Sequence, residues 1–518
     1  MLAVLTPEQM AAADAATIAA GTPSSTLMER AGRAVARAAV RLAGGAYGRR
    51  FLILCGKGNN GGDGLVAARL LAAQGAAPAV VFFGDPGDLR GDPARNFARL
   101  PSSVRVLRYE PEAFQRELGR AELIIDALVG TGFAGTLGGD LAAAVGAAND
   151  SAKPVLAVDI PSGVAGATGQ VDGPAIRAHA TVTMAALKLG LVLVPGCDHT
   201  GAVEVADIGI AVPHPGLAPE SEVIGAPGPD DVARALGKRP HEAHKRSVGT
   251  VMIVAGSVSM PGAAALAAAA ALRSGAGLVS LATVEPVAHQ MHAKIPEATT
   301  LLLPATPTGS IAAAALQPIL ERAETVDAVA LGPGLTTNPE TASLIRTLAE
   351  RIQKPLVIDA DGLNALAEHP EVLARRSLPT VITPHPGEMA RLAATSSKAV
   401  QADRLGIARQ MARTLSATVV LKGYRSVVAA PNGEVVVITT GGPALATGGT
   451  GDVLTGITVA LLAGGPTGGQ PFPAAWAASW VHGRAGDLLG ARIGSRGALA
   501  GDLPAAVAEV MHELEGER

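Results

Sequence analysis

Short runs of apolar residues alternate along the chain with longer segments in which apolar residues keep a helical spacing. In the first half, the apolar runs are FLILC (51–55), PAVVFFGD (78–85), ELIIDALVG (122–130) and PVLAVDIPSG (154–163). The segment LVAARLLAAQ (65–74), between the first two, has the helical spacing. Several of these runs end in glycine and polar residues. Strands that alternate with helices predict a parallel sheet, with a functional site at the carboxyl ends of its strands.

Two segments before the first of these strands have the polar signals of a helix start. Thr6-Pro7-Glu8-Gln9 has the form of a capping box with proline at the first helical position. Thr26 with Glu29 forms a second box, which predicts a helix that continues to Ala43.

The same alternation restarts in the second half of the chain, after a segment rich in proline and glycine. That segment, residues 213–231, has no apolar period and is predicted to be a linker. The later strands are predicted at TVMIVAG (250–256), GLVSLAT (277–283), VDAVALG (326–332), KPLVIDAD (354–361), PTVITP (379–384) and ATVVLKG (417–423). SVVAAP and EVVVIT flank Asn432-Gly433, which predicts a hairpin and therefore an antiparallel edge in the second sheet. We expect two α/β domains, residues 1–220 and 221–518.

Composition excludes several classes of function. Of the 518 residues 48% are hydrophobic and only 2% aromatic, so the chain can build large cores but has few platforms for base stacking. The net charge of −3 argues against a nucleic-acid partner. The two cysteines, Cys55 and Cys197, exclude a disulfide framework and a cysteine-rich zinc site.

The sequence shows no targeting or membrane segment. The start, MLAVLTPEQM, lacks the basic region and cleavage site of a signal peptide. The most apolar stretch, Gly262 to Ala282, is mostly alanine and contains Arg273, which favours a buried helix over a membrane span. We expect a cytoplasmic protein with no membrane partner.

A glycine-rich turn follows the strand at 51–55. Gly56-Lys-Gly-Asn-Asn-Gly-Gly-Asp-Gly64 contains G-x-G-x-x-G before a helix, where backbone N–H groups can approach a pyrophosphate. Asp63 weakens this interpretation because a carboxylate repels an anion, and a helix N-cap is an equally good reading of it.

Polar residues also follow the next two strands. Parallel packing would bring Asn60, Asp126, Asp159 and Ser162 to one rim, as oxygen ligands suited to a hard cation rather than zinc. The alternative is that each of them only caps its own helix.

Three motifs together resemble the epimerase domain of the NAD(P)H-hydrate repair enzymes: GNNGGDG (58–64), Asp126 with GTGFAG (130–135), and DIPSG (159–163). The resemblance covers about residues 1 to 220 and implies a Rossmann-like three-layer αβα fold. It implies that Asn60, Asp126 and Ser162 hold K⁺. It implies that the hydrated nucleotide contacts Asn59, Asn60, Gly61, Gly62, Asp63, Gly130, Thr131, Gly132, Phe133, Ala134, Gly135, Thr136 and Asp159.

The chemistry of such a substrate indicates what the residues must do. The hydroxyl of the hydrate sits on a ring carbon next to nitrogen, whose lone pair can expel the hydroxyl or open the ring. Asp159 is the candidate acid/base that would equilibrate the R and S epimers and stabilise the cation. Lys188 is either its partner or a solvated lysine beside a strand.

The most informative string of the second half is Ala446-Thr-Gly-Gly-Thr-Gly-Asp452, which opens a long apolar helix. Its small residues expose successive N–H groups as an anion hole, and Asp452 is placed to accept a proton from an acceptor hydroxyl. The alternative is an ordinary helix cap. The chain has no Walker A motif, which excludes P-loop chemistry.

This string resembles the anion-hole motif of the ribokinase-like fold. GSVSMPGAA (256–264), SGAGLVSLAT (274–283), GPGL (332–335), DADGLN (359–364) and THPGEMARL (383–391) narrow the resemblance to the dehydratase of the same repair family, dependent on ADP or ATP. It implies a ribokinase-like αβα domain in which the hydrate contacts Ala263, Gly334, His385 and Asp452. It implies that the adenine nucleotide contacts Lys422, Gly423, Tyr424, Arg425, Ser426, Gly449, Thr450 and Gly451.

The mechanism follows from leaving-group chemistry. Asp452 would deprotonate the hydroxyl of the hydrate as it attacks the terminal phosphate of the nucleotide, and the ring nitrogen would then expel phosphate. Mg²⁺ bridging the phosphates is expected. Without the resemblance, His385 would be taken as a packed structural residue.

Two other histidine motifs suggest no chemistry. His241 and His244 form H-x-x-H without a third ligand and are predicted to lie in an exposed segment, and His482 is predicted to lie on a helix. We expect one chain that repairs hydrated NADH or NADPH and forms a homo-oligomer. The rival hypotheses are a vitamin or sugar kinase joined to an unrelated isomerase, and a nucleotide sensor without activity.

Overall fold

A computed structural model of the chain describes residues 1–212 and 223–516. The chain divides into two compact units, Leu2–His214 and Pro215–Arg518. The predicted boundary between residues 220 and 221 and residues 213–222 of the predicted linker lie outside the described residues. None of the described helices is long and apolar enough to cross a bilayer.

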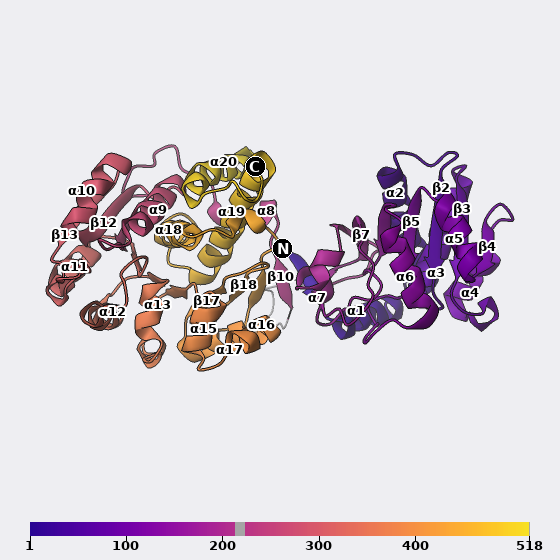
Figure 1. Ribbon diagram of the computed structural model, residues 1–518, viewed down its shortest axis with the longest axis horizontal. Helices are drawn as coiled ribbons and strands as arrows, with labels where there is room; N and C mark the ends of the chain where they lie inside the picture. The colour runs from indigo at the N-terminus through magenta and orange to yellow at the C-terminus, as the bar shows by residue number, and fades with distance from the viewer. Residues whose placement is uncertain (213–222, 517–518) are drawn as a thin grey trace. The chain divides into compact units, whose positions relative to one another are not determined.

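The N-terminal unit is built on a seven-stranded sheet of parallel strands (Figure 1). Its strands, in spatial order, are β4 (Arg105–Arg108), β3 (Ala77–Phe82), β2 (Arg50–Cys55), β5 (Leu123–Ala127), β6 (Val155–Val158), β7 (Ala180–Met184) and β9 (Ala202–Ala206). The order reverses between β2 and β5, as in a Rossmann fold, and such a switch point is where ligands bind. Outside this sheet, β1 (Leu2–Leu5) pairs in parallel with β8 (Leu187–Lys188).

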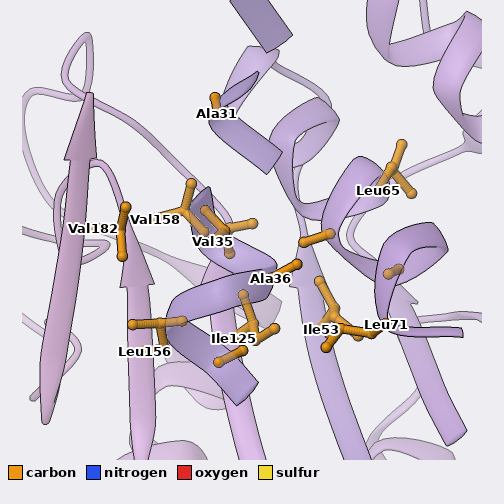
Figure 2. Close-up of a cluster of buried hydrophobic side chains, with 14 of the residues drawn as sticks. Ala31, Val35, Ala36, Ile53, Leu65, Leu71, Ile125, Leu156, Val158 and Val182 are labelled. Atoms are coloured by element: carbon orange, nitrogen blue, oxygen red, sulfur yellow. The ribbon is translucent and has the colours of Figure 1, made fainter. Parts of the chain in front are cut away.

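Helices cover both faces of this sheet because alternate strand residues point to opposite sides. Ile53 faces the helices α2 and α3, whereas its neighbours Leu52 and Leu54 face α5 and α6. Figure 2 shows Val35 of α2 packed over Ile125. The helices of this unit are α1 (Pro7–Ala19), α2 (Ser24–Ala43), α3 (Asn59–Ala73), α4 (Gly91–Ala98), α5 (Pro111–Arg120), α6 (Gly139–Asp150) and α7 (Leu189–Val192).

The C-terminal unit repeats this plan. Its strands, in spatial order, are β13 (Thr299–Leu303), β12 (Leu278–Val284), β11 (Thr250–Val254), β14 (Ala328–Leu331), β15 (Leu356–Ile358), β16 (Thr380–Ile382), β17 (Thr418–Leu421), β18 (Val427–Ala429), β19 (Val435–Val437) and β10 (Ile224–Ala226). The order reverses between β11 and β14, which makes a second switch point. The predicted hairpin is confirmed, because β17, β18 and β19 run antiparallel.

Helices again lie on both faces of the second sheet. Helices α9, α18, α19 and α20 contact one another, and so do α11, α12, α13 and α15 in sequence. The helices are α8 (Pro229–Leu236), α9 (Pro261–Arg273), α10 (Glu285–Lys294), α11 (Leu316–Glu324), α12 (Pro339–Arg351), α13 (Asp361–Leu366), α14 (Glu371–Ala374), α15 (Pro386–Leu392), α16 (Ser397–Ala402), α17 (Arg404–Leu415), α18 (Thr450–Ala463), α19 (Pro471–Ile493) and α20 (Leu503–Gly516). The predicted α/β class is therefore confirmed for both units.

The structure confirms some of the predicted helix starts and segments and contradicts others. The capping box at Thr6 is present, with Gln9, but Thr26 lies inside α2, which begins at Ser24 without a side-chain cap. The predicted linker is wrong beyond residue 222, because buried Ile224 and Ala226 belong to β10, which pairs with β19. The stretch 262–282 is only partly helical, since α9 ends at Arg273 and a strand follows.

Candidate active sites

The first candidate site lies at the switch point between β2 and β5. The turns that follow the two strands touch, because Gly56 N donates to Ala127 O at 3.0 Å. A Cβ on Gly56 would lie 1.9 Å from Leu128 O, so only glycine fits there. The GNNGGDG segment is therefore held against the turn that follows Asp126.

This segment is itself the first turn of α3. The first helical hydrogen bond of α3 runs from Gly62 N to Gly58 O, at 3.1 Å, so the N–H groups of Asn59, Asn60 and Gly61 precede it. A Cβ on Gly61 would lie 2.0 Å from Gly56 O. The glycines thus let α3 approach β2 closely, in addition to the role expected for them in exposing N–H groups.

Three of the predicted cation ligands form one hydrogen-bonded group. Ser162 donates to Asp126 through its backbone N at 2.8 Å and its Oγ at 2.6 Å. Val129 connects the group, since its N donates to Ser162 Oγ at 3.1 Å and its O accepts from Asn60 Nδ2 at 2.8 Å. The structure therefore brings Asn60, Asp126 and Ser162 together, as the sequence predicted.

Asp126 is fully buried within this group. Burial raises the pKa of its carboxyl to about 6, although hydrogen bonds from Ser162 and Leu128 oppose the rise. No cationic side chain among the described residues forms an ion pair with it. A buried carboxylate surrounded by neutral oxygens and lacking a positive partner fits a monovalent cation.

Asp159 forms a buried ion pair that the sequence left open. Lys188 Nζ lies 2.5 Å from Asp159 Oδ1 and also donates to Thr183 Oγ1 and Met184 O, both at 2.8 Å. The side chain of Lys188 is only 1% exposed, so the alternative of a solvated lysine is wrong. Asp159 has a left-handed backbone, with φ at +65°, which turns the chain sharply at the end of β6.

Asp63 lies beside this pair and not at a helix end. It is inside α3, whose N-cap is Gly58, so the N-cap reading of Asp63 is wrong. Burial raises the pKa of the Asp63 carboxyl well above its usual range, and the charge of Asp159 raises it further. Lys188 opposes this rise, and Asp14 of α1 adds to it. The Asp63 carboxyl therefore lies close enough to Asp159 and Lys188 to be affected by their charges.

The loop at 130–136 forms the outer wall of this site. Gly132, Ala134, Gly135 and Thr136 are exposed, and Thr136 Oγ1 donates to Asp172 O at 2.5 Å. Phe133 instead packs its ring against the core under α5 and α6. Of the loop residues named from the sequence, Phe133 is therefore the one anchored to the core.

The second candidate site includes the start of α18. Its N-cap is Gly449, with φ at +95°, and the first helical bond runs from Val453 N to Gly449 O at 3.3 Å. The N–H groups of Thr450, Gly451 and Asp452 therefore precede the helical ladder. A helix start of this kind attracts the phosphate of a ligand.

Asp452 is a largely buried carboxyl on this first turn. Burial raises the pKa of Asp452 to about 7, and the charges of Asp359 and Asp361 add to the rise while Lys422 opposes it. A general base works best when its pKa lies near the working pH. A pKa raised in this way would suit Asp452 to act as a general base.

A cluster of charges that the sequence did not predict surrounds Lys422. Its Nζ lies 2.6 Å from Asp359 Oδ1 and 3.8 Å from Glu388 Oε2, and Thr455 donates to Asp359 Oδ2 at 2.7 Å. Burial lowers the pKa of Lys422, but the two carboxylates outweigh it and the net shift is upward. A Cβ on Gly451 would lie 3.4 Å from Nζ, so Lys422 points toward the anion hole.

His385 is the N-cap of α15. Its Nδ1 accepts from Gly387 N at 2.9 Å, and Glu388 Oε2 accepts from His385 N at 2.7 Å, which completes a capping box. The side chain is 51% exposed. His385 is therefore not packed in the core, and its other ring nitrogen, Nε2, lies 3.4 Å from Glu388 Oε1.

The remaining predicted residues lie on the loops around these groups. A Cβ on Gly334 would lie 2.9 Å from the Cβ of Ala263, so these two residues are in contact. In the predicted nucleotide segment, the guanidinium of Arg425 lies 5.0 Å from the centre of the Tyr424 ring and bonds to Thr439 O. Arg404 Nη2 donates a hydrogen bond to Lys422 O at 3.2 Å, which helps to fix the start of this loop.

His482 makes a contact with the second site that the sequence did not predict. It is half-buried on α19, and its Nε2 lies 2.9 Å from the O atom of Thr450, in the anion-hole turn. Burial lowers the pKa of His482 to about 4, so the ring is neutral at pH 7. His241 and His244 are exposed as predicted, and within residues 1–212 and 223–516 no cluster of His, Cys, Asp and Glu suits a metal ion.

Comparisons with known proteins match both halves of the chain. Residues 251–508 match the family model described as NAD(P)H-hydrate dehydratase, and residues 24–190 match that of the YjeF-related protein N-terminus. The bifunctional NAD(P)H-hydrate repair enzyme of Moorella thermoacetica is 43% identical over 501 residues, 96% of this chain and 94% of that protein. The enzyme of the same name from Escherichia coli is 34% identical, over 92% of this chain and 87% of that protein.

A solved structure also matches. The ADP/ATP-dependent NAD(P)H-hydrate dehydratase of Bacillus subtilis, co-crystallised with ATP and Mg²⁺, is 30% identical, with a TM-score of 0.48. The match covers 56% of this chain and 99% of that one.

Proposed function

The chain belongs to the family of bifunctional NAD(P)H-hydrate repair enzymes, and from this we propose how its residues perform the two reactions. Its N-terminal part is the epimerase of hydrated NADH and NADPH, and its C-terminal part is the ADP- or ATP-dependent dehydratase. We assign the two activities to residues 1–220 and 221–518. The observation that carries this proposal is the same at both switch points: a buried carboxyl of raised pKa lies near a lysine–aspartate ion pair, Asp63 near Lys188–Asp159 and Asp452 near Lys422–Asp359.

In the epimerase, Asp159 and Asp63 divide the acid and base roles. Lys188 pairs with Asp159 at 2.5 Å, whereas burial raises the pKa of the Asp63 carboxyl. Asp63 donates a proton to the hydroxyl that leaves, and the carboxylate of Asp159 stabilises the positive charge spread over ring nitrogen and carbon. Return of water to either face of the planar ring gives both epimers.

K⁺ fits the group formed by Asn60, Asp126 and Ser162. The fit rests on a fully buried carboxylate without a positive partner among the described residues, and on neutral oxygens beside it. Bound there, K⁺ would supply a fixed positive charge. The turns after β2 and β5 would then present Asn59 to Gly61 and residues 130–136 to the nucleotide.

In the dehydratase, Asp452 acts on the hydroxyl of the S hydrate. Its carboxylate takes the hydroxyl proton as the oxygen attacks the terminal phosphorus of ADP or ATP, and AMP or ADP leaves. The ring nitrogen then expels inorganic phosphate, and loss of a proton from the neighbouring carbon restores the dihydronicotinamide. The N–H groups of Thr450 and Gly451 and the ammonium of Lys422 stabilise the transferring phosphoryl group.

The substrates occupy opposite sides of Asp452. Ala263, Gly334 and His385 contact the hydrate, and the loop from Lys422 to Ser426 contacts the adenine nucleotide. Mg²⁺ would neutralise charge on the nucleotide phosphates. The carboxylates of Asp359 and Glu388, which lie near Lys422, are the oxygen groups that would help to hold this ion.

The two activities complement each other, because dehydration accepts one epimer and epimerisation supplies it from the other. A mixture of R and S hydrates, incubated with the protein, ADP or ATP, Mg²⁺ and K⁺, should regain the near-ultraviolet absorbance of dihydronicotinamide completely. A kinase that releases a stable phosphate ester would regain none of it, and a nucleotide sensor would convert nothing. A cytoplasmic location and a homo-oligomer stay predictions.

A further inference from the structure

A polar hollow lies beside the dehydratase site, and the predicted nucleotide loop does not line it. It has a volume of about 460 Å³ and lies between α12, α13 and α15. Its lining includes Thr336, Arg346, Asp361, Asn364 and Arg391. None of these residues has a role in the mechanism above.

The hollow adjoins the groups that react. Asp361 lines it, and the charge of Asp361 also acts on Asp452. Thr336 follows Gly334 by two residues, and its backbone N donates to Asp361 Oδ2 at 2.8 Å. Arg391 lies on α15, the helix that His385 caps. The hollow is therefore next to the residues that would contact the hydrate.

The lining carries the guanidinium groups of Arg346 and Arg391 together with the carboxylates of Asp361 and Glu368. Arg391 Nη2 bonds to Asn364 Oδ1 at 2.7 Å, and the contact of Arg346 is a longer one, to Ala365 O at 3.4 Å. Each guanidinium has five N–H donors, so most of them stay available. The carboxylate of Asp361 already accepts from Thr336 N and from Asn364 Nδ2 at 3.1 Å.

The residues assigned to the hydrate so far would contact only its reacting end. Its reacting ring is joined through ribose to a pyrophosphate and an adenosine, and the loop that follows β17 is assigned to the other nucleotide. In the strand order β14, β15, β16 and β17, Thr336 follows β14, Asp361 follows β15 and α15 follows β16, whereas that loop follows β17. Arginine pairs well with phosphate oxygens because its planar fork can donate two hydrogen bonds.

We propose that this hollow binds the pyrophosphate of the coenzyme hydrate, through Arg346 and Arg391. The inference rests on the proposed function for the identity of the substrate. It explains how the dehydratase distinguishes a complete coenzyme from a fragment, since binding energy from a distant part of the substrate positions the reacting ring.

The test compares two substrates in four proteins. The substrates are the S hydrate of NADPH and the S hydrate of reduced nicotinamide riboside, which has no phosphate. The proteins are the unchanged chain, Arg346→Gln, Arg391→Gln and the control Arg351→Gln, an exposed arginine of the same helix α12. We expect each of the first two changes to lower the ratio of kcat/KM for dinucleotide over riboside about tenfold or more. The KM for ADP or ATP should stay the same.

Two results would overturn the inference. One is an unchanged ratio in both variants, and the other is the same loss of ratio in Arg351→Gln. Binding of NADPH, followed by its fluorescence, provides a readout that needs no turnover, and Arg391→Gln should weaken it about tenfold. If the unchanged chain dehydrates no hydrate, the proposed function fails, while the binding result still decides the inference.

Discussion

The Nζ atom of Lys188 lies 2.5 Å from the Oδ1 atom of Asp159, and two further hydrogen bonds hold the ammonium in the protein interior. A buried pair of this kind is costly to assemble, because both charges lose their hydration. Here it sits beside Asp63, a carboxyl whose pKa is raised. The arrangement places an acid of raised pKa near a carboxyl that pairs with lysine, which suits Asp63 to donate a proton and Asp159 to face the positive ring during epimerisation.

Asp159→Asn should therefore abolish epimerisation. We expect its rate to fall at least about 100-fold, because the amide can neither hold the positive ring nor take a proton. Dehydration of the purified S hydrate by the same variant should be unchanged. Asp150→Asn, an exposed change at the end of α6, is the control. Epimerisation at a normal rate in a folded Asp159→Asn protein would remove Asp159 from the mechanism.

K⁺ should stabilise the N-terminal unit specifically. If Asp126 ligates the ion, raising K⁺ should raise the melting temperature, since a ligand that binds only the folded state stabilises it. Li⁺ at equal ionic strength should have a smaller effect. In Asp126→Asn the difference between the two ions should vanish. An equal response of the unchanged chain to K⁺ and Li⁺ would argue against a selective site.

The dehydratase should depend on pH through Asp452. Since burial raises its pKa to about 7, kcat/KM should rise about tenfold per pH unit below that value and level off above it. Asp361 contributes to the raised pKa, so Asp361→Asn should move the inflection to lower pH. An inflection that stays in place would mean that another group titrates. Asp452→Asn should lose dehydration while it still binds ADP.

Acid should destabilise the C-terminal unit through His482. Its pKa falls from 6.5 to about 4 on folding, so between these values the unfolded chain binds more protons and folding stability decreases as the pH falls. The contribution of His482 is complete above pH 6.5 and amounts to about 1.4 kcal/mol per pH unit inside the window. His482→Gln should reduce this slope in denaturant unfolding. His512→Gln, an exposed change on α20, should leave it intact.

The fold was predictable to the extent that local patterns decide it. Runs such as FLILC are apolar throughout because both faces of a central parallel strand are covered, and Asn432-Gly433 marks the hairpin. The strand β10 was missed because Ile224 and Ala226 are too few to show a period among prolines and glycines. Thr26 was wrongly predicted to be the helix cap, because α2 already begins at Ser24. Its N-cap is Pro23, which makes no side-chain hydrogen bond.

Some site residues could be predicted from their place after a strand, and others could not. Asn60, Asp126 and Ser162 follow strands directly, so parallel packing alone brings them together. Lys188 gave no such signal, because ALKLGLVLVPG does not show that its one lysine is buried. Asp359 is 63 residues from Lys422 in the chain, and His482 is 32 residues from Thr450, so only the tertiary fold reveals these contacts.

The most direct test of the account starts from the pure R hydrate, with ADP or ATP, Mg²⁺ and K⁺. The unchanged chain should restore dihydronicotinamide absorbance faster than the spontaneous epimerisation allows. Asp159→Asn alone and Asp452→Asn alone should not, whereas an equal mixture of the two variants should recover the conversion. If either variant alone converts the R hydrate at the full rate, or if the mixture fails while both proteins are folded, the division of the two reactions between the two switch points is contradicted.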